Sequence, residues 1–565
     1  MAVVTGLFTW GVRPLLEALV RTRVESAAAR HGVVARIEAV HVGVWPFLRL
    51  EGVDLDLGHG TRWRADAVAA TWPGHLHLAV RAATITGPGG VTIGSAETSW
   101  EMAGALGDEL RLTLREPQTG LALRRRADAA GSVWNIEARG LDAGRLLIVQ
   151  RDGHALFDGG IVDGQVDFQS SPGAMRFGVD VGLRGARLGG LAGTATDDPQ
   201  HGDPTDVSLQ FDGAWQRDVG AIDIQMLQAT VAGAHLSGSL ALTHLDTEPA
   251  IDLKLGVNRL DFAQVLGASG LAVPDSLGLA HGRSQDLGSA TIDLRVLGPL
   301  AAPATLSVSQ KIDFKPPQEL PPGISRLRGP FLFGATDSSG QNRTLDVSPA
   351  SADFIALGDV PPLFLRTLLL AEDASFYGHR GIDLRELPAA LLTNWSRGTA
   401  ARGASTISQQ LAKNLFLSRD KQLGRKLQEL AITFLLESAL GKGRILEIYL
   451  NIIEWGPDLR GLRPAARHYF GREPRSLRPA EMAFLVAIIP GPIKYQSSFA
   501  RGAPGPGLRS LIDDLLAKLR SVDAISEEEY RRALDEPLVV AGDHTPWRLE
   551  DDLEQTRRDP LSSGP

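Results

Sequence analysis

The sequence of 565 residues contains no cysteine. This absence excludes disulfide frameworks, zinc sites with thiolate ligands and cysteine nucleophiles. It does not identify a compartment, because a periplasmic protein can fold without disulfides. The chain also lacks an excess of positive charge: its formal net charge is -8, which argues against a general nucleic-acid-binding protein. We therefore expect no nucleic-acid partner.

The chain has no long apolar run near its N-terminus. Residues 2–12 are apolar, but Arg13, Pro14 and Glu17 interrupt the pattern, whereas a membrane-spanning helix needs about 20 apolar residues. No lysine or arginine precedes the run, as a signal peptide would require. Because helical spacing continues, we predict a membrane-associated helix over residues 1–30. A helix that packs on its own domain is the alternative.

Length and composition indicate several folded domains. A chain of 565 residues exceeds one ordinary hydrophobic core, so about two to four domains are expected. The 62 glycines and 33 prolines favour a region rich in turns and strands over an all-helical protein. The charge is uneven, because residues 351–500 contain 19 Lys+Arg and 14 Asp+Glu, a balance of +5 that leaves -13 for the remainder. A basic segment in an acidic protein indicates an anionic substrate or membrane surface.

Residues 31–315 carry the pattern of antiparallel strands. Apolar and polar residues alternate in 34–57, again in Ile251–Val257 and again in Ile292–Val296, with Gly-rich gaps between such runs. Period-two alternation predicts a sheet with one buried face. The stretch after the N-terminal helix and the run 238–266 loosely resemble AsmA-like proteins, long β-structures of Gram-negative envelopes. An unrelated β-sandwich or β-groove that serves as a spacer is the alternative.

A proline-rich stretch separates this region from a helical one. Four prolines in KPPQELPPG predict a linker over residues 316–350. Apolar residues then recur at helical spacing, which predicts a mainly helical domain over residues 351–500. Residues 501–565 are predicted to form a C-terminal helix followed by a disordered tail.

The first candidate site is EDASFYGHRG, which begins at Glu372 and Asp373. These carboxylates end an apolar helix, where burial can raise the pKa of an acid toward the range that suits general acid–base work. An aromatic residue, Phe376, and a histidine, His379, follow. Taken alone, such a carboxylate pair at a helix end is more often a solvated helix cap.

Two further blocks carry polar and basic residues. GASTISQQLAKN, residues 403–414, opens a helix with small and hydroxylated residues, which is typical of an anion-binding turn, and it places Gln410 and Lys413 on one helix face. RKLQE, residues 425–429, places Arg425 and Glu429 four residues apart. That spacing suits either a surface ion pair or a cationic clamp for phosphate beside a second carboxylate. Two apolar blocks, 443–472 and 477–492, are interpreted as mostly helical core.

Together and in this order, these blocks resemble the peptidoglycan glycosyltransferase family (glycosyltransferase family 51), and its monofunctional members in particular. The resemblance covers residues 355–497, about a quarter of the chain. It implies a lysozyme-like helical fold whose membrane-dipping subdomain would lie at residues 384–400. It also implies that lipid II is polymerised into β-1,4 glycan strands, with inversion at the anomeric carbon and release of undecaprenyl pyrophosphate.

The resemblance assigns a role to each matching residue. Glu372 matches the catalytic glutamate, the general base that takes the proton of the acceptor 4-hydroxyl. Glu429 matches the second glutamate, which orients substrate or holds a divalent cation. Lys413 and Arg425 match the basic residues that stabilise the leaving pyrophosphate. The residues that match cleft-shaping positions are Asp373, Phe376, His379, Thr406, Gln410 and Lys426.

The resemblance also implies partners and a location. The expected partners are lipid II, the growing glycan chain, the inner membrane and, as a candidate, a separate transpeptidase. No cofactor is implied as obligatory, and a divalent cation, Mg²⁺ or Mn²⁺, is the candidate, with Glu429 as its candidate ligand. We expect the protein at the periplasmic face of the bacterial inner membrane.

Two other classes of function stay open from the sequence. A lytic glycosidase of lysozyme type would need two carboxylates but no anion clamp, so Lys413 and Arg425 would have no purpose. A catalytically silent envelope scaffold or lipid-handling protein would not need Glu372 and Glu429. The sequence does not reveal what the N-terminal β-rich region binds, the oligomeric state or a metal requirement.

Overall fold

The computed structural model has two compact units, each considered by itself below. One comprises Met1–Val273, Asp286–Lys315 and Asp420–Gln428, and the other Pro274–Gln285, Pro316–Arg419 and Glu429–Pro565. The residues that the structure describes are 13–30, 33–42, 47–58, 61–71, 76–81, 84–86, 91–94, 98–103, 109–114, 120–128, 131–142, 148–151, 154–155, 157–188, 203–268, 273–279, 286–302, 305–337, 340–386, 405–417, 423–493 and 503–540.

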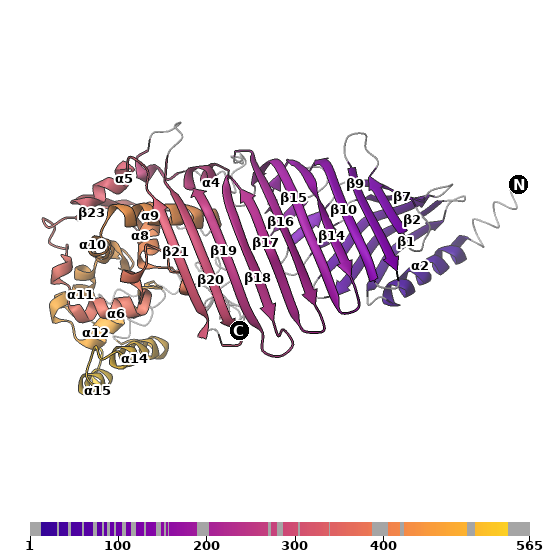
Figure 1. Ribbon diagram of the computed structural model, residues 1–565. Coiled ribbons are helices and arrows are strands. Elements are labelled where there is room, and N and C mark those ends of the chain that lie inside the picture. Colours follow the sequence, from indigo (N-terminus) through magenta and orange to yellow (C-terminus); the bar gives the residue numbers. More distant parts are fainter. Residues whose placement is uncertain are drawn as a thin grey trace, which may run out of the picture. The chain divides into compact units, whose positions relative to one another are not determined.

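The first unit is a β-rich region, as its alternating pattern predicted. Its described strands pair only in the antiparallel sense, and the main path runs in chain order from β14 to β21, which lie side by side in Figure 1. The strands are β1 (Val34–Val42), β2 (Phe47–Gly58), β3 (Thr61–Thr71), β4 (Leu76–Arg81), β5 (Thr84–Thr86), β6 (Val91–Gly94), β7 (Thr98–Ala103), β8 (Glu109–Leu114), β9 (Gly120–Asp128), β10 (Gly131–Asp142), β11 (Ile148–Arg151), β12 (His154–Ala155), β13 (Phe157–Asp158), β14 (Ile161–Ser170), β15 (Ala174–Leu188), β16 (Thr205–Gln216), β17 (Ala221–Val231), β18 (Ala234–Thr243), β19 (Ala250–Asp261), β20 (Ser289–Pro299) and β21 (Ser307–Lys315).

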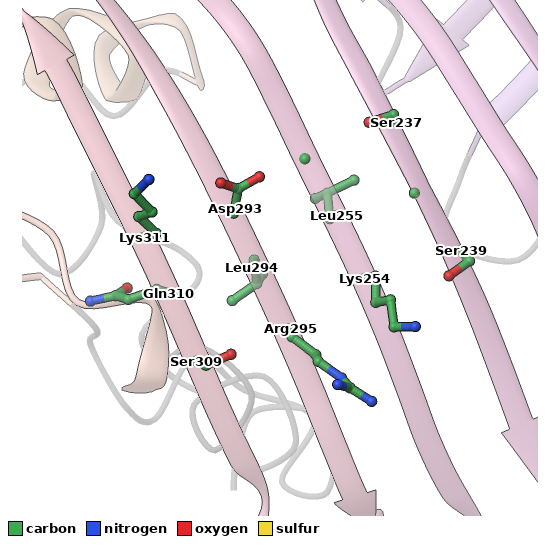
Figure 2. A pocket seen from close by; sticks show the side chains of 12 residues that line it. Ser237, Ser239, Lys254, Leu255, Asp293, Leu294, Arg295, Ser309, Gln310 and Lys311 are labelled. Atoms are coloured by element: carbon green, nitrogen blue, oxygen red, sulfur yellow. The ribbon is translucent and has the colours of Figure 1, made fainter.

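The pairing of residues across the strands shows that apolar and polar side chains lie on opposite faces of this sheet. Residues one position apart in a strand point to opposite faces, so each row of paired residues belongs to one face. An aliphatic row crosses four strands through Leu240, Leu253, Val296 and Val308. The neighbouring row, drawn in Figure 2, is polar and consists of Ser239, Lys254, Arg295 and Ser309. The predicted one-sided alternation is therefore present in β18 to β21.

Two of the described helices lie wholly within the same unit. α2 (Arg13–Arg30) covers the described part of the predicted N-terminal helix, and residues 1–12 lie outside the described residues. Within the described ranges, α2 and every other helix fall short of the length and hydropathy that crossing a membrane requires. α4 (Phe262–Ala268) follows β19 and buries Phe262 and Leu266.

The second unit is mainly helical, as helical spacing predicted for residues 351–500. Its longer helices are α6 (Pro362–Glu372), α8 (Ile407–Phe416), α9 (Leu423–Ala439, of which residues 423–428 group with the first unit), α10 (Lys442–Ile452), α11 (Leu462–Phe470), α12 (Pro479–Ala487), α14 (Pro506–Ser521) and α15 (Glu527–Asp535). Short helical turns are η2 (Asp275–Leu277), α5 (Pro322–Ser325), η4 (Arg326–Arg328), η5 (Leu357–Asp359), η6 (Phe376–Gly378), η7 (Leu384–Glu386) and η8 (Pro474–Ser476), and two hairpins pair β22 (Phe331–Thr336) with β23 (Asn342–Val347) and β24 (Glu454–Gly456) with β25 (Leu459–Arg460).

The core of the helical unit is centred on α10. Six of its side chains, from Ile445 to Ile452, are fully buried. Asn451 fixes this helix to a neighbouring segment, because its amide donates to the Ile355 carbonyl at 2.8 Å and its oxygen accepts from the Ile355 N–H at 2.8 Å. Trp455 continues the core and donates to the Leu485 carbonyl at 2.9 Å. The packing and these hydrogen bonds therefore fix the position of α10 within the helical unit.

The segment 316–350 differs from the predicted linker. It contains α5, η4 and the β22–β23 hairpin, and it buries Ile324, Leu327 and Phe333. Arg444 of α10 donates to the carbonyls of Leu327 and Gly329 at 2.9 and 2.6 Å. Its prolines therefore shape turns of a folded segment, since proline suits the first turn of a helix as well as an extended spacer. The other domain boundaries stay predictions.

The predicted helix after residue 500 is present as α14 and α15. α14 packs against α6 and α12, and Arg366 of α6 donates to the carbonyl of Val522 at 2.6 Å. The predicted disordered tail, from residue 542, lies outside the described residues.

Candidate active site

The two adjacent carboxylates occupy the C-terminal end of α6. Glu372 is the last helical residue, and Asp373, with φ of -164°, leaves the helix. The helix ahead of them is apolar and buries Phe364, Thr367 and Leu368. At the end of this packed helix, Asp373 is buried and Glu372 is half-buried.

Asp373 is committed to structural hydrogen bonds. His379 Nε2 donates to its two oxygens at 3.0 and 3.1 Å, and the backbone N–H of Ile407 donates to Oδ2 at 3.0 Å. Ile407 is the first residue of α8, so the carboxylate also stabilises the positive end of that helix. Asp373 thus joins the turn after α6 to the start of α8.

His379 is held in one tautomer. Its Nδ1 accepts a hydrogen bond from the Gly381 N–H at 3.0 Å, so the ring proton must reside on Nε2, which faces Asp373. The residue is 5% exposed, and its ring packs edge-on against that of Phe376. A buried histidine with both ring nitrogens hydrogen-bonded holds the loop after α6 in place.

Glu372 has a different environment from that of its neighbour. Its Oε2 accepts a hydrogen bond from Gln410 Nε2 at 2.8 Å, and Gln410 Oε1 in turn accepts from the Tyr449 hydroxyl at 2.9 Å. The chain of hydrogen bonds therefore runs from α10 through α8 to the end of α6. It orients the carboxylate from one side.

Burial raises the pKa of Glu372 above its ordinary value. The hydrogen bond from Gln410 lowers that pKa, the negative charge of Asp373 raises it, and the positive charge of Lys413 lowers it. The balance is a carboxylate that is easier to protonate than an exposed glutamate. Such a group suits general base work near neutral pH, because proton transfer is most efficient when the catalytic pKa lies close to the working pH.

Thr406 caps α8. Its hydroxyl accepts from the Gln409 N–H at 3.2 Å, while the Gln409 side chain accepts from the Thr406 N–H at 3.0 Å, a reciprocal capping box. The same hydroxyl donates to the Gly381 carbonyl at 2.5 Å. Residues 403 and 404, the start of the predicted anion-binding turn, lie outside the described residues, as do residues 387–400 of the predicted membrane-dipping segment.

Gly381 allows the loop after α6 to approach α9. Its φ is +95°, and a Cβ there would lie 2.7 Å from Thr433 Cγ2 and 3.0 Å from Glu437 Cγ. Glu429, Thr433 and Glu437 follow one face of α9 at four-residue spacing. The Glu429 side chain is thus on the helix face that the Gly381 loop packs against, and the residue is 4% exposed.

Phe376 fills the space beneath this loop. It is fully buried, and the Lys442 ammonium lies 4.3 Å from the centre of its ring. The same ammonium is 2.7 Å from Glu437 Oε1, which also accepts from Ser408 Oγ at 2.5 Å. Three helices, α8, α9 and α10, therefore converge on the loop that follows Glu372.

The structure places one of the predicted cationic residues near Glu372 and leaves the placement of the other two open. Lys413 is exposed on α8, one turn after Gln410, and its charge acts on Glu372. Arg425 and Lys426 lie in the first turns of α9, which group with the β-rich unit. Their convergence on Glu372 therefore stays a prediction. Among the predicted site residues, those joined around Glu372 are Asp373, Phe376, His379, Thr406, Gln410 and Lys413.

No metal centre is evident in the described part of the chain. Groups of three or more His, Asp or Glu side chains with metal-binding geometry do not occur among these residues. A divalent cation at Glu429 would need ligands from the substrate or water, which is how Mg²⁺ is commonly held.

Sequence reasoning missed Tyr449. It lies in the block that was interpreted as core, and its side chain is indeed fully buried. Burial and the negative charges of Glu372 and Asp373 raise the pKa of Tyr449 well above its ordinary value, so the phenol keeps its proton. The signal available in the sequence was a hydroxyl within an otherwise aliphatic helix, because a buried hydroxyl needs a partner.

A separate depression lies on the polar face of β18 to β21 (Figure 2). It is open to solvent, and its charges are largely paired with neighbours: Arg295 lies 3.2 Å from Asp252, and Lys311 lies 3.3 Å from Asp313. Nothing in it resembles the buried acid and hydrogen-bond chain of the helical unit. The helical unit therefore holds the candidate active site.

Comparison with known proteins supports this choice of site. The family model described as transglycosylase matches residues 341–503. A biosynthetic peptidoglycan transglycosylase from Nitrosomonas eutropha is 51% identical over 132 residues, which are 23% of this chain and 54% of that protein. One from Nitrobacter winogradskyi is 40% identical over 182 residues, 32% of this chain and 78% of that protein. This chain thus spans between about half and three quarters of their lengths.

The comparison with a solved structure supports no conclusion about this chain. Penicillin-binding protein 1A from Haemophilus influenzae aligns with a TM-score of 0.20 and 18% identity, over 41% of this chain and 24% of that one. The family model carries more weight, because it covers the segment that holds Glu372, Gln410 and Glu429. Since the chain covers 78% of a relative that is 40% identical to it, it belongs to the transglycosylase family.

Proposed function

We propose that the helical unit is a peptidoglycan glycosyltransferase that polymerises lipid II into β-1,4 glycan strands, with Glu372 as the general base. The observation that carries the proposal is the environment of Glu372. Its carboxylate is half-buried, its pKa is raised, and a hydrogen bond from Gln410 at 2.8 Å holds it in place within the segment that the family model matches.

In the proposed reaction, the Glu372 carboxylate takes the proton of the acceptor 4-hydroxyl. The acceptor oxygen then forms a bond to the anomeric carbon of the growing chain, while the bond from that carbon to the pyrophosphate oxygen breaks. The pyrophosphate leaves with the electron pair on its lipid carrier, and the configuration inverts from α to β. The proton stays on Glu372 until it is released to solvent.

Positive charge is needed where the pyrophosphate departs. Lys413 and Arg425 are proposed to stabilise this growing negative charge, since charge stabilisation at the leaving group is commonly a large part of catalysis. Lys413 is exposed one helical turn from Gln410, where it can meet a bound substrate. Asp373 is not a competing base, because both of its oxygens accept hydrogen bonds from His379 and the Ile407 N–H.

Further features follow from the same proposal. We propose a lysozyme-like arrangement for the helical unit and action at the periplasmic face of the inner membrane, on lipid II and the growing glycan chain, alongside a separate transpeptidase. Glu429 is proposed to orient the substrate or to hold Mg²⁺ or Mn²⁺. Resemblance of the β-rich unit to AsmA-like proteins stays a hypothesis.

The test is polymerisation by the purified full chain. Incubation with lipid II should yield glycan strands of high molecular mass that a muramidase degrades, because the new linkage is β-1,4. A chain that forms no polymer but shortens preformed glycan strands would instead be a lytic glycosidase. A chain that does neither would be a silent scaffold.

A further inference from the structure

Tyr449 places its hydroxyl at the inner end of the hydrogen-bond chain that reaches Glu372. The side chain is fully buried on α10, and its hydroxyl donates to Gln410 Oε1 at 2.9 Å. Gln410 Nε2 then donates to Glu372 Oε2 at 2.8 Å. We propose that Tyr449 is a positioning residue that fixes the orientation of the Gln410 amide and thereby holds the Glu372 carboxylate ionised and aimed at the acceptor hydroxyl. This inference rests on the proposed function.

An amide side chain has no intrinsic direction in such a site. Its oxygen accepts and its NH₂ donates, and the two groups have nearly the same shape, so the partners decide which way it faces. If the Gln410 amide turned around, its oxygen would face the Glu372 carboxylate and two acceptors would meet. The Tyr449 hydroxyl opposes this reversal, because it presents a proton to the amide oxygen.

Tyr449 is suited to this task because its hydroxyl stays protonated and its side chain lies on a well-packed helix. Its burial and the nearby acids disfavour the phenolate, so the hydroxyl remains a donor across the working range of pH. The neighbouring side chains Ile448 and Leu450 are fully buried, and Asn451 ties the helix to Ile355. A donor on such a rigid helix can hold a partner's geometry closely.

The charged and titratable groups that act on Glu372 come from three elements. Asp373 belongs to its own turn and is itself bonded to His379, Lys413 lies on α8, and Tyr449 lies on α10. Of these, Tyr449 is the one that reaches Glu372 through an intervening amide. Its removal therefore changes the carboxylate without removing a charge.

The experiment compares the full chain with its Tyr449→Phe variant in lipid II polymerisation across a range of pH. We expect kcat to fall by about fivefold, the scale of one hydrogen bond between neutral groups, with KM within about twofold of the wild type. Without the oriented amide the carboxylate is easier to protonate, so the acid limb of the kcat/KM profile should move to higher pH.

The matched control is Tyr469→Phe. Tyr469 is 1% exposed, and its hydroxyl donates to the Trp455 carbonyl at 2.7 Å, so its loss also removes one buried hydrogen bond. We expect a similar drop in thermal midpoint for both variants but a wild-type pH profile for Tyr469→Phe. If Tyr449→Phe matches this control in kcat and pH profile, or fails to fold where the control folds, Tyr449 is merely structural.

A second measurement does not depend on activity. A glutamate with a raised pKa in the folded state contributes stability that is present below its unfolded pKa and is lost as pH rises through the folded pKa. Tyr449→Phe should therefore lose more thermal stability between about pH 4 and pH 7 than the wild type or Tyr469→Phe. An equal loss in all three would overturn the positioning role. Absence of polymer from the wild type would reject the proposed function but leave this comparison valid.

Discussion

At the scale of single residues, the adjacent acids Glu372 and Asp373 have different environments. Asp373 accepts from His379 and from the start of α8, so its charge is used to join elements. Glu372 is half-buried with its pKa raised, and a hydrogen bond from a neutral amide supports it. A carboxylate with a raised pKa beside a polar hydrogen-bond chain is the kind of group that the proposed general base requires.

Lys413 provides a prediction at this scale. Replacing it by Ala should lower the rate of lipid II polymerisation by roughly 10²–10³, the usual cost of removing a group that stabilises developing charge. Lys518, which is exposed on α14, is a matched control, and Lys518→Ala should change the rate by less than about twofold. A loss below about threefold in Lys413→Ala would remove its role at the pyrophosphate.

The sequence allowed some of these residues to be predicted and not others. Glu372 and Gln410 were found because they lie in blocks whose order resembles a family. Tyr449 was not found, because a tyrosine within an aliphatic helix looks like packing. Its partner, Gln410, is 39 positions away in sequence, and no local spacing rule connects residues on different helices.

At the scale of elements, the predicted helices agree with the structure where apolar spacing was regular. Within the helical domain that was predicted over residues 351–500, α8 (Ile407–Phe416) and α9 (Leu423–Ala439) are examples. The segment 316–350 was the exception, because prolines suit both spacers and the first turns of helices. Its buried side chains, such as Ile324, are spaced too irregularly to produce a periodic signal.

Gly381 provides a prediction at this scale. Ala at this position would adopt an unfavourable φ and press against Thr433 and Glu437 of α9, so Gly381→Ala should lower the free energy of unfolding by about 2 kcal/mol or more. Gly378 is the control, because the nearest atom to an added Cβ there is the end of the Arg385 side chain at 4.0 Å. Gly378→Ala should change stability by less than about 0.5 kcal/mol.

Denaturant unfolding of these two variants measures the difference. Equal stabilities would show that the loop after α6 does not need its close approach to α9. The polymerisation rate of Gly381→Ala should also fall, since a displaced loop moves His379 and Asp373 relative to α8.

At the scale of the whole molecule, the chain combines a long antiparallel sheet with a helical unit that contains the candidate site. Alternation predicted the sheet and its one-sided aliphatic rows, because period two is set by strand geometry. The ligand of this sheet could not be predicted. An alternation of apolar and polar residues indicates which face of a strand is apolar, but it carries no information about a ligand. Family membership applies to the transglycosylase segment, residues 341–503.

The central claim is that Glu372 is the base of this molecule's reaction. The most direct measurement is lipid II polymerisation by full-length Glu372→Gln, beside the wild type and with thermal unfolding of both chains as the check on folding. The amide can still accept the hydrogen bond from Gln410, so the variant should fold with at least the wild-type thermal midpoint at neutral pH, yet make no detectable glycan. Polymer formed by the folded variant at the wild-type rate would contradict the account.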